Sequence, residues 1–216
     1  YKRGTSVYLV DRVVPMLPEV LSNGICSLND HEDRYAMTCM MEIDDSGTVV
    51  NYRIRPSIIH VGRRCSYKEV YKALEENIIP DDLQDFMPML WDLAEISKIL
   101  NRMRRRRGAL DFDFPEYKVL LDLDGTPLRI VKRDRTMAER LIEECMLIAN
   151  ETVATHLKNT HRTSVYRIHE SPSEEKLDLF QKVLNYLGQN LVLSADGVTP
   201  RDFQKILDVV KGQDIE

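Results

Sequence analysis

Glycine-rich phosphate loops are missing from this sequence. Its nine glycines are scattered over 216 residues, and none falls in a G-x-G-x-x-G or G-x-x-x-x-G-K-[ST] pattern. The zinc-protease motif H-E-x-x-H and the hydrolase motif G-x-S-x-G are missing as well. These absences exclude the enzyme classes that those motifs define.

Cysteine and histidine spacings typical of metal sites are also lacking. The four cysteines form no C-x-x-C pair, which argues against a zinc site and against a redox-active pair. Of the five histidines only His156 and His161 lie close together, at a spacing not known for metal ligation. We therefore expect four reduced thiols and structural or surface histidines.

Long apolar runs are absent too. No run approaches the roughly 20 residues that a membrane-spanning helix requires. The chain starts at Tyr1, without a methionine and without the apolar stretch of a signal peptide. We expect a cytoplasmic protein, and we interpret the chain as an internal piece of a longer one.

Positive charge is in short supply. The formal net charge is −5, which by itself argues against a nucleic-acid binder. The charge is uneven, however, because five arginines gather within six positions: Arg102, Arg104, Arg105, Arg106 and Arg107. Two interpretations of this block stay open, a solvated helix end favoured by the helix dipole or a contact with phosphate.

The composition that is present, 43% hydrophobic and 30% charged, is that of a folded globular protein. Its periodicity predicts an α+β fold with hairpins and several amphipathic helices. Residues 35–43 alternate on one face, and Asp45-Ser46-Gly47 then turns into a second alternating run through Val50, which predicts a β-hairpin. Residues 109–114 and 117–123 are predicted strands, and Asp124-Gly125 is a turn into a strand over 128–131.

Helix starts are indicated by a cap residue followed three positions later by an acid. Such pairs are Ser66 with Glu69, Thr136 with Glu139, Ser171 with Glu174 and Thr199 with Asp202. In the last two, Pro172 and Pro200 are predicted at the first helical position. A long helix is expected over residues 81–107, ending at Gly108. The helix after Thr136 should bury a stripe of Leu141, Cys145, Ile148 and Thr152.

Paired carboxylates are the one pattern that suggests metal chemistry, since two-metal nucleases hold Mg²⁺ between such groups. The pairs are Asp44-Asp45, Asp81-Asp82 and Glu143-Glu144. The first lies at the predicted turn and the second at a helix start, so we interpret both as structural.

Six ordered segments resemble one known family. RGTSVYL at residues 3–9 and VPMLPEVLSNGICSLN at 14–29 resemble the signature of the RNB catalytic domain of the RNase II / RNase R family, with Asp30 where proline is common. SY at 66–67, RGALDFDFPE at 107–116, LIEECMLIAN at 141–150 and YRIHESP at 166–172 fit in the same order. They cover nearly all of the chain and are most similar to the ribonuclease R branch.

The resemblance implies that residues 1–216 are part of an RNB catalytic domain. The family's catalytic aspartate cluster is expected upstream of RGTSVYL, and its catalytic arginine motif downstream of YRIHESP. On this interpretation no catalytic residue lies in the chain, most Mg²⁺ ligands lie outside it, and the chain alone is expected to be inactive.

What the chain retains resembles the RNA-holding wall of the active-site channel. Tyr8 and Phe112 match two aromatic residues that stack on bases at the RNA 3′ end, and stacking is independent of base identity. Tyr67 and Glu143 match a pair that contacts the ribose near the scissile phosphate, where the 2′-hydroxyl distinguishes RNA from DNA.

The function implied is that of a Mg²⁺-dependent 3′→5′ exoribonuclease, which processively hydrolyses single-stranded RNA from its 3′ end and releases nucleoside 5′-monophosphates. Flanking OB-type domains in the full-length protein would supply part of the RNA affinity that this acidic chain lacks. The alternative is a nuclease-dead RNB homologue that serves as an RNA-binding or interaction module. An intact aspartate cluster would favour the enzyme, and a substituted one the module.

Overall fold

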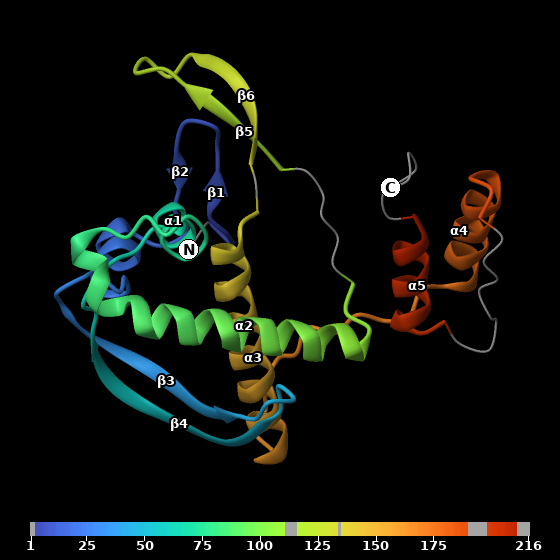
Figure 1. Ribbon diagram of the computed structural model, residues 1–216, viewed down its shortest axis with the longest axis horizontal. Coiled ribbons are helices and arrows are strands. Elements are labelled where there is room, and N and C mark those ends of the chain that lie inside the picture. The colour runs from blue at the N-terminus through green and yellow to red at the C-terminus, as the bar shows by residue number, and fades with distance from the viewer. Residues whose placement is uncertain (1–2, 111–115, 134, 190–197, 211–216) are drawn as a thin grey trace.

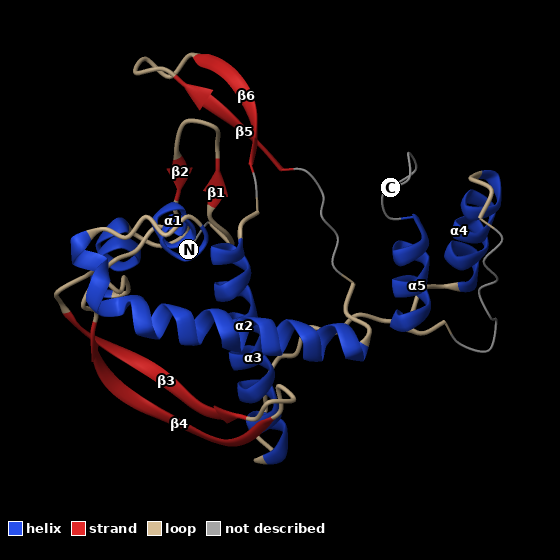
Figure 2. Ribbon diagram, viewed as in Figure 1, coloured by secondary structure: helices blue, strands red, loops and turns tan. Residues whose placement is uncertain are grey.

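The computed structural model describes residues 3–110, 116–133, 135–189 and 198–210 (Figure 1). The architecture is α+β, as predicted, with helices and three two-stranded antiparallel sheets in this part of the chain (Figure 2). Strands β1 (Val7–Tyr8) and β2 (Val13–Val14) form a short hairpin. A π-helix over Val20–Ile25 then leads to the second hairpin.

The second hairpin joins β3 (Asp33–Ile43) to β4 (Val49–His60), and its prediction is confirmed. The carboxylate of Asp44 closes the turn by accepting hydrogen bonds from the backbone N–H groups of Ser46 and Thr48, each at 2.9 Å. Gly47 has φ +88° and lies against α2, where a Cβ would come within 2.7 Å of the Met103 side chain. Only glycine fits this position without strain.

Helix α1 (Tyr67–Glu75) begins with the predicted capping box of Ser66 and Glu69. The long helix expected over residues 81–107 is divided, since Asp81–Phe86 is a 3₁₀ helix and α2 covers Met87–Arg107. Pro88 explains the division, because its ring excludes the carbonyl four residues earlier and is tolerated only in the first helical turn. Gly108 ends α2 in the left-handed conformation, as expected.

The third hairpin consists of β5 (Glu116–Leu121) and β6 (Pro127–Arg133). Its first strand begins one residue earlier and ends two residues earlier than predicted, because Asp122 already starts the turn by accepting from the N–H groups of Asp124 and Thr126. The expected strand over 109–114 is wrong for residues 109 and 110, which are loop, and the rest lies outside the described residues.

Helix α3 (Met137–Asn159) crosses α2 and has the predicted capping box at Thr136. Of its predicted stripe, Leu141, Ile148 and Thr152 are buried and Cys145 is half-buried. Leu83, Met87 and Leu90 form a core with residues of α1 and Ala138 at the start of α3.

Helices α4 (Glu174–Tyr186) and α5 (Pro200–Val210) form a pair beside the end of α2. The start predicted for α4 is wrong, because Ser173 and not Ser171 stands at its cap, with Glu174 and Glu175 in the first turn. Acidic residues favour that position by interacting with the helix dipole. The start predicted for α5 is confirmed, with Pro200 first and Asp202 accepting from the N–H of Thr199 at 3.0 Å.

Candidate functional site

Tyr8 lies on the β1–β2 hairpin and points away from any core. Its side chain is 78% exposed. The hairpin is tied together at its base, since Ser6 Oγ accepts from the Met16 N–H at 3.0 Å and Arg3 donates to the Pro15 carbonyl at 2.6 Å. Phe112, its predicted stacking partner, lies outside the described residues. Tyr8 is therefore accessible to a ligand on a pinned hairpin.

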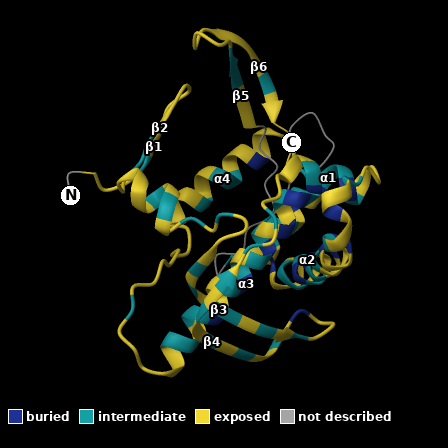
Figure 3. Cartoon of the chain, turned by 90° about the vertical axis from the view of Figure 1, so that its left-hand side faces the viewer, coloured by how far each residue is buried: buried dark blue, intermediate teal, exposed yellow. Residues whose placement is uncertain are grey.

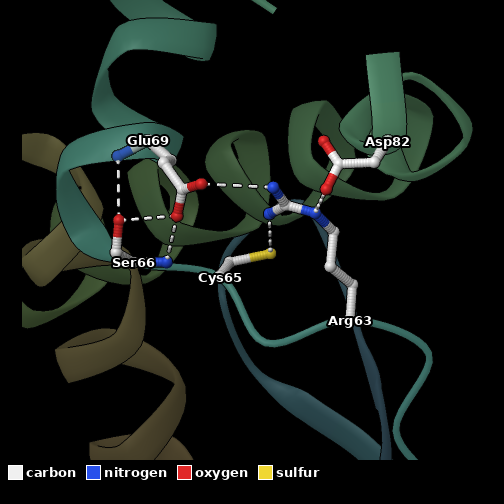
Figure 4. A network of polar contacts seen from close by, with 5 residues as sticks. All are labelled: Arg63, Cys65, Ser66, Glu69 and Asp82. Carbon is white, nitrogen blue, oxygen red and sulfur yellow. Dashed lines mark hydrogen bonds and ion pairs between the residues drawn. The ribbon is translucent and has the colours of Figure 1, made fainter. Parts of the chain in front are cut away.

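Tyr67 is the first residue of α1, and its side chain is 45% exposed. A polar network holds the backbone on which it stands (Figure 4). Arg63 reaches from the loop after β4 to Asp82 at 2.9 Å and to Glu69 at 3.2 Å. Figure 4 shows the guanidinium between the two carboxylates, with Cys65 below it at 3.3 Å.

Charge is strongly stabilised in this network. The hydrogen bonds that Glu69 accepts from the Ser66 hydroxyl and N–H, and then from Arg63, lower the pKa of the Glu69 carboxyl to about 2. The hydrogen bond to Asp82 is the largest cause that raises the pKa of Arg63. The start of α1, and with it Tyr67, is thus fixed by ionised groups from three segments of the chain.

Glu143 stands on the second turn of α3, half-buried, and both its oxygens face arginines. It pairs with Arg135, and its Oε1 lies 3.9 Å from Arg104 Nη1. Arg104 comes from the arginine block on α2. The carboxylate that is expected to contact ribose is therefore oriented by cations on either side.

Glu144, next to it, was not identified from the sequence as different from a surface acid. It is 3% exposed, and its Oε1 accepts from Asn101 and from Arg104, each at 2.9 Å. Its Oε2 has no partner among the described residues. The sequence spacing could have indicated that Glu144 is buried, because Glu144 is three residues after Leu141 and four before Ile148, on the buried stripe.

The predicted site residues come from separate elements that converge only in part. Helix α1 packs on α3, which brings the elements of Tyr67 and Glu143 together, whereas Tyr8 belongs to the hairpin. Among the described residues, no hydrogen bond or ring contact joins Tyr8, Tyr67 and Glu143 to one another.

Metal and membrane features were sought in the same part of the chain. There, no three His, Cys, Asp or Glu side chains gather in a way that could hold a metal ion. The described helices include none with the length and apolarity needed to cross a membrane. The residues described here thus do not fit a Mg²⁺ site.

Comparison with known proteins identifies the family. Residues 1–215 match the RNB domain, and the chain belongs to this family. It is 42% identical to ribonuclease R 1 of Lactococcus lactis over 214 residues, which are 99% of this chain and 26% of the relative. Ribonuclease R of Thermotoga maritima is 42% identical over 98% of this chain and 30% of its own length. The chain thus spans between a quarter and a third of these relatives.

Solved structures share the fold of this chain. Mycoplasma genitalium RNase R, determined in complex with ribose-methylated single-stranded RNA, superposes with a TM-score of 0.91 at 31% identity, over 97% of this chain and 33% of that one. The same protein has been solved with double-stranded RNA. Yeast Ssd1, described as a pseudonuclease, shares the fold with a TM-score of 0.68 at 18% identity, over 98% of this chain and 25% of that one.

Proposed function

We propose that this chain is part of the catalytic domain of a 3′→5′ exoribonuclease, which degrades single-stranded RNA processively from the 3′ end and releases nucleoside 5′-monophosphates. The observation that carries the proposal is the match to the RNB domain along residues 1–215, together with the TM-score of 0.91 to an RNase R that binds RNA. Within the intact protein the chain would form part of the wall that holds the RNA 3′ end.

Each proposed RNA contact has a chemical role. Tyr8 and Phe112 would stack on bases, and the 78% exposure of Tyr8 supports this, since a stacking ring must be free of the core. Tyr67 and Glu143 would contact the ribose, with the hydroxyl and carboxylate hydrogen-bonding the 2′-hydroxyl. The ionised network at the start of α1 and the two arginines beside Glu143 would hold this pair in place.

The proposal assigns Mg²⁺ to the intact enzyme and its carboxylate ligands to an aspartate cluster outside the described residues. In RNA hydrolysis, bound Mg²⁺ supplies a Lewis acid that stabilises charge on the phosphate. This part of the chain would bind and orient the RNA.

The second candidate is a nuclease-dead RNB homologue that binds RNA or a protein. The likeness to yeast Ssd1 favours keeping it, because the same fold there belongs to a pseudonuclease. Both candidates are compatible with RNA binding by this chain, and only the enzyme predicts degradation.

The deciding experiment uses the intact parent protein with 5′-labelled single-stranded RNA and Mg²⁺. We expect stepwise shortening from the 3′ end, with nucleoside 5′-monophosphates as products. The 216-residue chain under the same conditions should leave the RNA intact. RNA bound but not degraded by the intact protein would instead establish the nuclease-dead homologue, and degradation by the chain alone would place the active site within it.

The ribose contacts are tested in the same parent. Tyr67→Phe and Glu143→Gln should each weaken the preference for RNA over DNA, because a lost hydrogen bond to a buried polar group costs about 1–3 kcal/mol. Unchanged discrimination in both variants would refute the assignment. Glu75→Gln, at the far and exposed end of α1, is the matched control.

A further inference from the structure

A cleft of about 590 Å³ opens where four elements meet away from the proposed RNA wall. The β3–β4 turn, the last turn of α2, the middle of α3 and the start of α5 line it. In Figure 1 the turn lies below α2, whereas the β1–β2 hairpin with Tyr8 lies above it. The residues that line the cleft include Tyr52, Met103 and Ile148 and three arginines, Arg106, Arg107 and Arg201.

The three arginines differ in whether an ion pair already neutralises their charge. Arg107 makes a bidentate pair with Glu151, at 2.8 and 3.0 Å, so both oxygens of the one carboxylate that lines the cleft in the described part of the chain are used. Arg106 has no ion-pair or hydrogen-bond partner for its guanidinium among the described residues. One cation of the sequence's arginine block therefore remains uncompensated at the cleft.

Arg201 brings a second cation from α5. Its Nη2 donates to the carbonyl of Arg106 at 2.8 Å, which satisfies an orphan acceptor at the end of α2 and places the Arg201 guanidinium beside the Arg106 backbone. The side-chain amide of Gln204 likewise donates a hydrogen bond to the Arg105 carbonyl at 3.1 Å. Two of the partially negative carbonyls at the α2 end, those of Arg105 and Arg106, are thus occupied by hydrogen bonds.

Asp44 belongs to the β3–β4 turn but does not line the cleft. Asp44 accepts from Ser46 and Thr48 within the β3–β4 turn, and these hydrogen bonds lower the pKa of its carboxyl. Ser46 and Thr48 line the cleft, and the Ser46 hydroxyl donates to Asp44 at 2.6 Å and lies 2.8 Å from the Thr48 hydroxyl. Because Arg106 and Arg201 line the same cleft and its Glu151 carboxylate already pairs with Arg107, the cleft is suited to an anion.

We propose that this cleft binds a phosphate group through Arg106 and Arg201. A guanidinium presents paired N–H donors that match phosphate oxygens, and the two here line one cleft from different helices. The phosphate could come from an RNA strand or from a free mononucleotide, and only the RNA source rests on the proposed function. The two interpretations of the arginine block would then be divided among its members. Arg106 would contact phosphate, whereas Arg104 and Arg107 form ion pairs within the protein.

The test is binding by the 216-residue chain, measured by calorimetry with adenosine 5′-monophosphate and by fluorescence anisotropy with a labelled oligoadenylate RNA. Arg106→Gln should weaken binding at least about tenfold, because it removes a cation and its charge-assisted hydrogen bonds to phosphate. Arg102→Gln is the matched control, because Arg102 belongs to the same block on α2, pairs with Glu95 at 3.9 Å and does not line the cleft.

Loss of binding to both probes in Arg106→Gln would support a site of mononucleotide size, and loss of RNA binding alone would support a contact with the RNA backbone. An RNA contact should also lower the salt dependence of binding in the variant. Equal affinities in Arg106→Gln and Arg102→Gln, or no binding of either probe by the parent chain, would overturn the proposal. Because the Arg106 side chain makes no ion pair or hydrogen bond among the described residues, its variant should melt at the temperature of the unmodified chain. Exonuclease activity of the intact protein is a separate readout, so the site and the proposed function can fail independently.

Discussion

The helical region of α1, α2 and α3 buries many of its apolar side chains, whereas the two hairpins β1–β2 and β5–β6 leave theirs exposed. In the helical region Leu83, Leu100 and Leu141 are at most 2% exposed. No residue of the two hairpins is buried, and Tyr8 and Ile130 are 78% and 68% exposed (Figure 3).

The total surface is large for the mass, at 17245 Å² against about 10,000 Å² for a compact monomer of 25.1 kDa. The buried apolar residues that the structure describes all lie in helices, and the hairpins present apolar groups for contact. The proposed stacking residue Tyr8 belongs to the second kind.

Truncation in the core should have the largest effect. Leu100→Ala removes a side chain that is 1% exposed on α2, and we expect it to lower the free energy of unfolding by about 2–5 kcal/mol. Ile130→Ala on β6 should change it by less than about 0.5 kcal/mol. Urea unfolding followed by circular dichroism measures both, and equal losses would break the division between the regions.

The neighbouring acids Glu143 and Glu144 give the next largest contrast. Glu144→Gln should destabilise by about 1–3 kcal/mol, because it discharges a buried carboxylate that accepts from Arg104 and Asn101. Glu143→Gln should cost less than about 1 kcal/mol, since its ion pairs are partly solvated. A larger cost for Glu143 in the same unfolding assay would reverse this assignment of roles.

Local rules predicted much of the fold. Gly108, the Ser66 and Thr136 capping boxes and the β3–β4 turn all follow from interactions within a few residues, and all are confirmed. The failure at α4 has a local reason too, since Ser171 and Ser173 are equally good cap residues and the sequence does not rank them.

The site was predicted less completely, because its geometry depends on distant segments. Motif matching suggested Tyr67 and Glu143, but the Arg63 that precedes Tyr67 pairs with Asp82 of the 3₁₀ helix, and Glu143 faces Arg104 of α2. Periodicity does not specify such pairings. Glu144 was missed because a charged residue on a buried stripe is rare, and its partner Arg104 lies 40 residues earlier.

A smaller effect is expected from pH at the start of α1. The folded pKa of Glu69, about 2, lies below its ordinary value of 4.5, so its stabilisation is complete above pH 4.5 and is lost as the pH falls toward 2. Glu69→Gln should lower the melting temperature above pH 4.5, and the difference from the parent should shrink toward pH 2. Glu75→Gln serves as the control, and a constant difference for Glu69→Gln over this range would contradict the network.

The most direct test of the central claim compares Tyr8→Ala with Tyr35→Ala, two exposed tyrosines on different hairpins, at 78% and 90% exposure. Both variants should melt within a degree or so of the parent, since neither ring is packed. Anisotropy with labelled oligoadenylate RNA should then show about tenfold weaker binding for Tyr8→Ala alone, because a base stacked on an aromatic ring contributes about 1–3 kcal/mol. Equal RNA affinities for the two variants would contradict the assignment of the β1–β2 hairpin to the RNA-holding wall.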